Sequence, residues 1–379
     1  MMMPTYTGDE SANVIAGSTG NDTIYGLGGN DTLDGGAGID VMYGGAGDDS
    51  FFIDSASDRV IELVGQGYDT AFTSTSFQLE AGSEVDAIRV ASASGTIALN
   101  LTGNAFGQVL AANDGSNFLD GRGGDDYLEG RGGADTLDGG TGNDVMRGGT
   151  GSDYYFIDSS LDRVLEAAGE GYDAAFTGTS FQLEVGAEVE ELRVGNAAGV
   201  AAITLTGNAF GQILAGNDGS NFLDGRGGDD YLEGRGGADT LDGGTGNDVM
   251  RGGTGGDYYF IDSALDRVLE AAGEGYDVAF TSTSFQLETG AEVEELRVGS
   301  AAGVAAITLT GNAFGQILAG NDGSNFLDGR GGDDYLEGRG GADTLDGGTG
   351  NDVMRGGTGG DYYLIDSALD RVQIGRAHV

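Results

Sequence analysis

Residues 17–52 read GSTGNDTIYGLGGNDTLDGGAGIDVMYGGAGDDSFF. The stretch contains four copies of one nine-residue phrase, Gly-Gly-x-Gly-x-Asp-x-apolar-x, in which an apolar side chain follows the aspartate two residues later. Glycine adopts backbone angles that other residues avoid and lets carbonyl oxygens converge on one point, while the aspartate adds a charged oxygen. Because hard oxygen ligands suit calcium, the phrase is predicted to be a calcium-binding turn.

The phrase recurs in four blocks along the chain. The aspartates at its sixth position are the candidate metal ligands: Asp22, Asp31, Asp40, Asp49, Asp126, Asp135, Asp144, Asp153, Asp230, Asp239, Asp248, Asp257, Asp334, Asp343, Asp352 and Asp361. Asp162 lies outside a phrase, so we expect its replacement to affect calcium binding little.

The residues around the apolar position alternate as in a strand, so each phrase is predicted to form a tight turn followed by a very short strand. Two phrases then make one coil of a flattened solenoid, with a turn on each side. Residues eighteen positions apart lie on the same side, which pairs Asp22 with Asp40 and Asp31 with Asp49. One ion is expected between successive turns.

This phrase closely resembles the RTX, or hemolysin-type, calcium-binding repeat, a nonapeptide of parallel β-helix proteins. The resemblance implies an all-β fold, namely a right-handed parallel β-roll or β-helix solenoid, with Ca²⁺ as the cofactor held between neighbouring glycine-rich turns. It also implies export from a Gram-negative bacterium, usually by type I secretion. Lower affinity is expected at the phrases whose second glycine is replaced: Ser18, Leu27, Arg122, Arg131, Arg226, Arg235, Arg330 and Arg339.

The nine-residue phrases are part of a longer sequence repeat of 104 residues, as the spacing from Asp40 to Asp144 shows. Residues 207–259 recur letter for letter as residues 311–363, which indicates recent duplication. The predicted organisation is a degenerate turn at 1–16, repeat blocks at 17–52, 117–156, 221–260 and 325–364, inter-block β-coils at 53–116, 157–220 and 261–324, a truncated segment at 365–372, and a tail at 373–379.

The inter-block residues carry more apolar side chains than the blocks, and they form either further solenoid coils or separate small domains. Steps of nine backward from Leu128 reach Leu119 and Leu110, which are both apolar, so the register favours coils. Asn117 holds the aspartate position of a faded phrase and is interpreted as a weaker ligand beside Asp135.

The chain ends in QIGRAHV, residues 373–379, where earlier copies of the long repeat continue differently. One back-translation of these residues contains a common sequencing adapter, so we interpret the tail as non-native and His378, the single histidine, as an artefact. Residues 1–19 have neither a charged start nor a long apolar run, so no amino-terminal leader is expected.

The composition indicates a chain that needs cations to become ordered. It has 379 residues, including 77 glycines, one proline and no cysteine, and 62 acidic against 17 basic residues give a net charge of −45. High charge and glycine content favour disorder, but a 39% hydrophobic content arranged on a regular ladder does not. We therefore expect mutually repelling carboxylates that need bound cations before the compact state is stable.

Several classes of chemistry lack the residues that they need. Without cysteine, and with one histidine in the tail, zinc sites, thiol nucleophiles and Ser-His-Asp triads are excluded. The acidic balance disfavours nucleic acid, no membrane span is expected, and Arg122, Arg131 and Arg147 are interpreted as partners of the acidic turns. The acidic residues Glu188, Glu190 and Glu191, repeated as Glu292, Glu294 and Glu295, are predicted to lie on a solvated strand face.

The sequence therefore predicts a non-enzymatic function. We expect an exported structural repeat region, secreted or on the bacterial cell surface, that binds calcium ions as its partner and folds when it meets calcium outside the cell. The alternative is a calcium-dependent folding and secretion module of a larger secreted enzyme or toxin, such as a protease, lipase or epimerase. A neighbouring catalytic domain in the full-length gene would favour this alternative.

Overall fold

The computed structural model describes residues 3–374, which form forty short strands and no helix. Within this range there is accordingly no helix of the length and apolar character that crossing a membrane requires. The chain divides into two compact units, Met1–Glu190 and Glu191–Val379. Of the predicted non-native tail, residues 375–379 lie outside the described residues.

The first unit holds the strands numbered β1 to β20. They are β1 (Thr5–Thr7), β2 (Val14–Ala16), β3 (Thr23–Gly28), β4 (Thr32–Asp34), β5 (Val41–Ala46), β6 (Ser50–Ile53), β7 (Arg59–Ile61), β8 (Thr70–Thr73), β9 (Phe77–Gln78), β10 (Ala87–Val90), β11 (Asn100–Thr102), β12 (Val109–Ala111), β13 (Phe118–Asp120), β14 (Tyr127–Gly132), β15 (Thr136–Asp138), β16 (Val145–Thr150), β17 (Tyr154–Ile157), β18 (Arg163–Val164), β19 (Ala174–Thr177) and β20 (Phe181–Gln182).

The second unit holds the strands numbered β21 to β40. They are β21 (Glu191–Val194), β22 (Thr204–Thr206), β23 (Ile213–Ala215), β24 (Phe222–Asp224), β25 (Tyr231–Gly236), β26 (Thr240–Asp242), β27 (Val249–Thr254), β28 (Tyr258–Ile261), β29 (Arg267–Val268), β30 (Val278–Thr281), β31 (Phe285–Gln286), β32 (Glu295–Val298), β33 (Thr308–Thr310), β34 (Ile317–Ala319), β35 (Phe326–Asp328), β36 (Tyr335–Gly340), β37 (Thr344–Asp346), β38 (Val353–Thr358), β39 (Tyr362–Leu364) and β40 (Arg371–Gln373).

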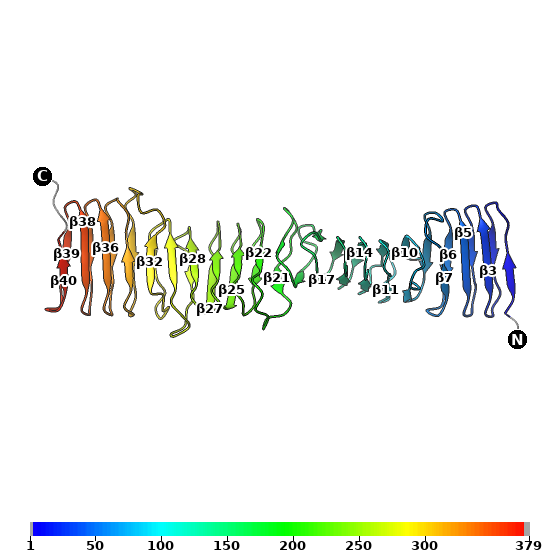
Figure 1. The fold of residues 1–379 in the computed structure, drawn as a ribbon, viewed down its shortest axis with the longest axis horizontal. Helices are drawn as coiled ribbons and strands as arrows, with labels where there is room; N and C mark the ends of the chain where they lie inside the picture. Colours follow the sequence, from blue (N-terminus) through cyan, green and yellow to red (C-terminus); the bar gives the residue numbers. More distant parts are fainter. Residues whose placement is uncertain (1–2, 375–379) are drawn as a thin grey trace. The chain divides into compact units, whose positions relative to one another are not determined.

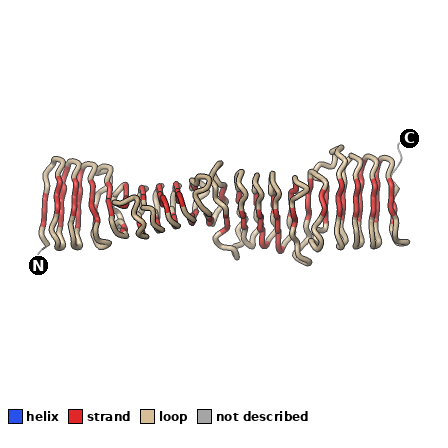
Figure 2. Tube along the Cα trace, turned by 180° about the vertical axis from the view of Figure 1, so that it is seen from behind, coloured by secondary structure: helices blue, strands red, loops and turns tan. Residues whose placement is uncertain are grey.

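Strands pair in parallel with the strand two places further along the chain, so the backbone crosses from one ladder to the opposite one at every turn. In the first unit the ladders run β1-β3-β5-β7, β2 to β18 in even numbers, and β9 to β19 in odd numbers. In the second unit they run β21 to β29 in odd numbers, β22 to β40 in even numbers, and β31 to β39 in odd numbers. Within each unit the strands lie side by side like rungs (Figure 1), and the turns form the edges of the ladders (Figure 2).

The pairing register inside the blocks is eighteen residues, which confirms the predicted two phrases per coil. Ile24 faces Met42 across β3 and β5, and Leu128 faces Met146 across β14 and β16. These apolar side chains follow the aspartates by two residues, and all four are completely buried. Inside the blocks the core is therefore a narrow column of one or two apolar side chains per strand, so the all-β parallel solenoid predicted from the phrase is confirmed.

The inter-block residues supply further parallel strands to the same ladders. Leu110 in β12 pairs with Leu128 in β14, as the stepped pattern predicts. The coil length is less regular there: Thr70 of β8 pairs with Ser50 of β6, twenty residues away, and with Ala87 of β10, seventeen residues away. Extra residues enter the loops, because the buried strand positions must stay in register.

Seven turn residues at the second phrase position hold a left-handed backbone conformation without being glycine. They are Leu27, Arg122, Arg131, Arg226, Arg235, Arg330 and Arg339, with φ between 69° and 84°. For residues with a Cβ atom this region costs roughly 1–2 kcal/mol, so each replaced glycine adds local strain to its turn. Whether calcium affinity is lower at these turns stays a prediction.

Candidate metal sites along the turn columns

The phrase aspartates stack in two columns, one along each edge of the coils. Within a column, Oδ1 of one aspartate accepts a hydrogen bond from the backbone N–H of the residue one coil earlier. Asp126 N–H donates to Asp144 Oδ1 at 2.8 Å, and Asp135 N–H donates to Asp153 Oδ1 at 2.7 Å. The same contact joins Asp22 to Asp40. The structure thus brings together the aspartates that the eighteen-residue spacing pairs.

The second oxygen of these carboxylates is buried and lacks a hydrogen-bond partner. This holds for Oδ2 of Asp31, Asp40, Asp49, Asp126, Asp135, Asp144, Asp153, Asp230, Asp239, Asp248, Asp257, Asp334, Asp343 and Asp352, and for Oδ1 of Asp22. Asp361 is the phrase aspartate outside this set, and it is half-buried. A buried charged oxygen without a partner is costly, so each of these positions needs a further positive group or a proton.

The first glycine of each phrase makes room for this free oxygen. A Cβ atom added to Gly130 would lie 2.2 Å from Asp135 Oδ2 and 2.8 Å from the carbonyl oxygen of Gly148 in the next coil. At Gly121 the corresponding distances, to Asp126 Oδ2 and to the Gly139 carbonyl oxygen, are 2.3 and 2.6 Å. A carboxylate oxygen and a carbonyl oxygen therefore converge on a space that only glycine leaves open.

Burial makes the charged form of these carboxylates unfavourable. Burial, reinforced by the negative charge of Asp144 and opposed by a hydrogen bond from Gln108, raises the pKa of Asp126 to about 7. Burial likewise raises the pKa of Asp144 to about 6, with Asp162 adding to the rise and the Asp126 N–H opposing it. Oxygen-only donors, some of them charged and unpartnered, fit a hard cation such as Ca²⁺.

The columns continue beyond the phrases and include Asp162, so the geometry gives a reason to expect that this aspartate does contribute to calcium binding. Its Oδ1 accepts a hydrogen bond from Asp144 N–H at 3.0 Å, and Asp144, Asp158 and Asp162 each place an oxygen within 4.8 Å of the others. Asp58, Asp266 and Asp370 hold the same position in the other copies. The eighteen-residue spacing between Asp144 and Asp162 indicates this position in the sequence, but no glycine-rich phrase precedes Asp162.

Glu188, Glu190 and Glu191, which we expected on a solvated strand face, are each partly exposed, and the first two also accept hydrogen bonds from backbone N–H groups. Glu190 Oε2 accepts a hydrogen bond from Asp173 N–H at 2.6 Å, so Glu190 continues a column that runs through Asp153 and Asp173. Glu188 accepts from Gly169 N–H. The loop before β21 that carries these side chains contains one glycine, Gly186, which belongs to no calcium-binding phrase.

Amides hold the first positions of the block columns. Asn117 N–H donates to Asp135 Oδ1, and Asn13 N–H donates to Asp31 Oδ1, both at 2.7 Å. Gln108 precedes Asp126 in the same way at 2.6 Å. The columns therefore begin with neutral oxygen donors and gain charge further along the block.

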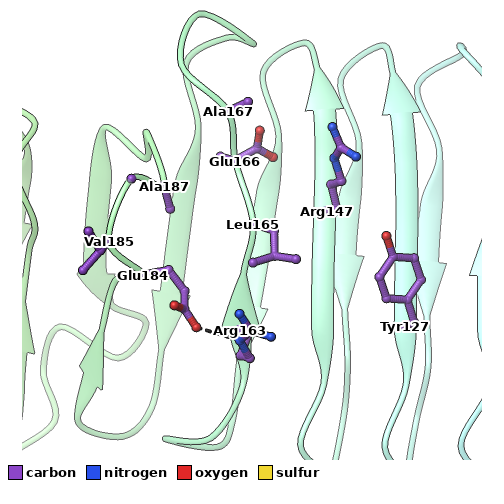
Figure 3. Close-up of a pocket in the computed structure, with 10 residues that line it drawn as sticks. Tyr127, Arg147, Arg163, Leu165, Glu166, Ala167, Glu184, Val185 and Ala187 are labelled. Atoms are coloured by element: carbon purple, nitrogen blue, oxygen red, sulfur yellow. Dashed lines mark hydrogen bonds and ion pairs between the residues drawn. The ribbon is translucent and has the colours of Figure 1, made fainter.

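The arginines pair with acidic side chains, as interpreted from the sequence. Arg122 lies 3.5 Å from Asp120 and Arg131 lies 3.6 Å from Glu129. A surface groove of about 350 Å³ is lined by Arg163, Glu166 and Glu184, and Arg163 lies 2.7 Å from Glu184. Figure 3 shows Arg163 and Glu166 on one segment and Glu184 on the neighbouring one. The three arginine–carboxylate pairs lie at the surface, so each contributes little to stability, whereas Glu166 is buried.

Comparison with known families agrees with this geometry. The matching family model describes an RTX calcium-binding nonapeptide repeat (4 copies), and it matches residues 7–42, 28–60, 102–137, 129–158, 206–241, 224–259, 310–345 and 331–363. These segments together span more than half of the chain. A search of curated proteins finds no match. The chain therefore belongs to the RTX calcium-binding nonapeptide repeat family, in which the repeats bind Ca²⁺ and build a β-roll.

Proposed function

We propose that this chain is an exported structural repeat region whose folding is switched on by calcium outside the bacterial cell. The observation that carries the proposal is the pair of carboxylate columns, in which buried oxygens without hydrogen-bond partners recur at each coil of the blocks. A chain built this way is poorly stable without cations, because its core is narrow and its carboxylates repel one another.

In this proposal the sixteen phrase aspartates supply the charged ligands. Their Oδ2 atoms, together with carbonyl oxygens of the first phrase glycines, face the space where the ion would be held, as at Asp135 and Gly148. Asp22 would use Oδ1 instead, because its Oδ2 accepts hydrogen bonds from Ser18. Bound calcium supplies the positive charge that these buried oxygens lack.

The switch follows from the concentration of free calcium on the two sides of the envelope. Extracellular calcium modules have dissociation constants of roughly 10⁻⁴–10⁻³ M, far above the cytosolic level. Inside the cell the carboxylates stay charged and unpaired, and the chain remains extended for export. Outside, a site at ten times its dissociation constant adds about 1.4 kcal/mol, so several sites together exceed the marginal stability of a typical domain.

A calcium titration followed by far-ultraviolet circular dichroism tests the proposal. The spectrum of the full chain is expected to pass from coil to β with millimolar calcium, cooperatively, and to revert with chelator. Magnesium at the same concentration is the control, because it demands a tighter octahedral shell and dehydrates reluctantly. A chain that is already β-structured in excess chelator, and unchanged by calcium, would exclude the switch.

A further inference from the structure

A second kind of carboxylate cluster lies where each of the first three blocks joins the coils that follow it. The last aspartate of the block is followed thirteen residues later by a glutamate and twenty residues later by an aspartate. The three sets are Asp49, Glu62 and Asp69; Asp153, Glu166 and Asp173; and Asp257, Glu270 and Asp277. The second and third members of each set lie outside the glycine-rich phrases.

In the third set the carboxylates converge. Asp257, Glu270 and Asp277 each place one oxygen within 4.8 Å of the others. Their residues are 0%, 6% and 1% exposed, so the cluster lies in the interior. Asp257 Oδ2, Glu270 Oε2 and Asp277 Oδ2 are all buried without a hydrogen-bond partner. Three unpartnered carboxylate oxygens in one buried space require a counter-charge or protons.

The other oxygens of the cluster are fixed by hydrogen bonds, which hold the free ones in place. Asp277 Oδ1 accepts from Asp257 N–H at 2.8 Å. Glu270 Oε1 accepts from Gly252 N–H at 3.2 Å and also from the Tyr259 hydroxyl. Arginines of the same coils are engaged elsewhere, since Arg251 pairs with Glu274 and Arg267 pairs with Glu288. The hydrogen bonds thus fix the positions of the three carboxylates, and the two arginines do not neutralise them.

The first block repeats the carboxylates without the tyrosine. Phe51 stands where Tyr259 stands in the third block, and both side chains are completely buried. Glu62 is 1% exposed, and its Oε1 accepts a hydrogen bond from Gly44 N–H at 2.5 Å. The inward direction of the glutamate is therefore independent of the tyrosine hydroxyl.

From this geometry we propose that each of the three junctions is a separate binding site for a hard divalent cation, held by two aspartates and the glutamate. Calcium is the ion expected, because all the donors are oxygens and the proposed function supplies that ion. Such a site links the last turn of a block to the two coils after it. The ion would extend cation-dependent order from the glycine-rich blocks into the inter-block coils.

The number of calcium ions bound by the full chain tests the proposal. The E62Q/E166Q/E270Q chain is expected to bind three fewer ions than the unmodified chain, measured by equilibrium dialysis against ⁴⁵Ca²⁺. The matched control is E80Q/E184Q/E288Q, which makes the same charge change at exposed glutamates that pair with Arg59, Arg163 and Arg267. The control is expected to bind as many ions as the unmodified chain.

An unchanged ion number in E62Q/E166Q/E270Q would overturn the junction sites, since the glutamates would then be held by protons alone. An unmodified chain that binds no calcium would instead remove the proposed function itself.

A second measurement does not depend on how well the glutamine variants fold. Tyr155 and Tyr259 touch the glutamates of their clusters, so bound Tb³⁺ there should be excited through them. Y155F/Y259F, which copies the natural Phe51, should keep the calcium number and lose part of the tyrosine-sensitised terbium emission. If the terbium emission is undiminished, no ion is bound beside these tyrosines, and the proposal is overturned.

Discussion

Replacing Gly130 by alanine should remove calcium binding at one turn, because the added Cβ meets the carboxylate and carbonyl oxygens that face the ion. The φ angle of Gly130 lies outside the left-handed region, so alanine fits the local conformation. The added Cβ would lie 2.2 Å from Asp135 Oδ2 and 2.8 Å from both Asp135 Cγ and the Gly148 carbonyl oxygen. These distances are too short for real contacts, so the carboxylate must leave the position in which it faces the ion.

The expected magnitude follows from the lost ion. At ten times the dissociation constant one site contributes about 1.4 kcal/mol, so the calcium-dependent part of the unfolding free energy should fall by about that amount. Alanine also lowers the entropy of the unfolded chain, which is worth roughly 0.4–1 kcal/mol. The close contact with the Gly148 carbonyl oxygen opposes this gain with or without calcium. The two effects separate when stability is measured in both conditions.

The assay compares thermal unfolding of the full chain with calcium and with chelator, together with the number of ions bound. The control is Gly178→Ala, where an added Cβ meets no atom within 4 Å and φ is again outside the left-handed region. G178A should keep the calcium-induced rise in Tm, and G130A should lose part of it and bind at least one ion fewer. A G130A chain with the full ion number would refute the assignment of this space to calcium.

Three further predictions concern the columns and turns. D144A and D162A should both weaken calcium binding by isothermal titration, because the two aspartates share one column; an unaffected D162A chain would restrict the sites to the phrases. The raised pKa of Asp126, about 7, means that the folded metal-free chain takes up protons more readily than the unfolded one. The stability of the metal-free chain should therefore rise as pH falls from about 7 towards 4, while its calcium affinity falls. Melting curves in calcium-free buffer and calcium titrations across this range would measure the two effects. A stability that falls with acidification would contradict this. Arg131→Gly should raise stability by roughly 1 kcal/mol, since relief of the left-handed strain outweighs an exposed ion pair with Glu129; a lowered Tm would mean that the arginine is needed.

The periodic part of this molecule could be predicted from sequence because its signals are local. The nine-residue phrase determines the turn. Leu128 follows Asp126 by two residues and therefore lies in the core, and the spacing of eighteen residues stacks Asp126 on Asp144. Each signal depends on residues within one coil or on the coil next to it. The coil and the pairing of the phrase aspartates follow from these steps, and the resemblance of the phrase to the RTX repeat implies the family and the fold class.

The inter-block ligands could not be found in the same way. Asp69 lies twenty residues after Asp49, and Asp86 lies seventeen residues after Asp69, yet all three belong to one column. Loops absorb the changes of length, so a fixed step loses the register there. Glu62 reaches inward from a coil that contains no glycine-rich phrase, and its direction depends on packing against the block rather than on its own neighbours in sequence.

The eighteen-residue register inside the blocks has a consequence for refolding. Residues 207–259 and 311–363 are identical, so strands such as β25 and β36 present the same side chains in the same pairing. A coil from one molecule can therefore stack on the corresponding coil of another molecule, and the strand pairing between molecules is as favourable as the pairing within one molecule. Concentrated solutions that meet calcium abruptly should form intertwined multimers, whereas dilute chains that meet it gradually, from one end, should fold alone.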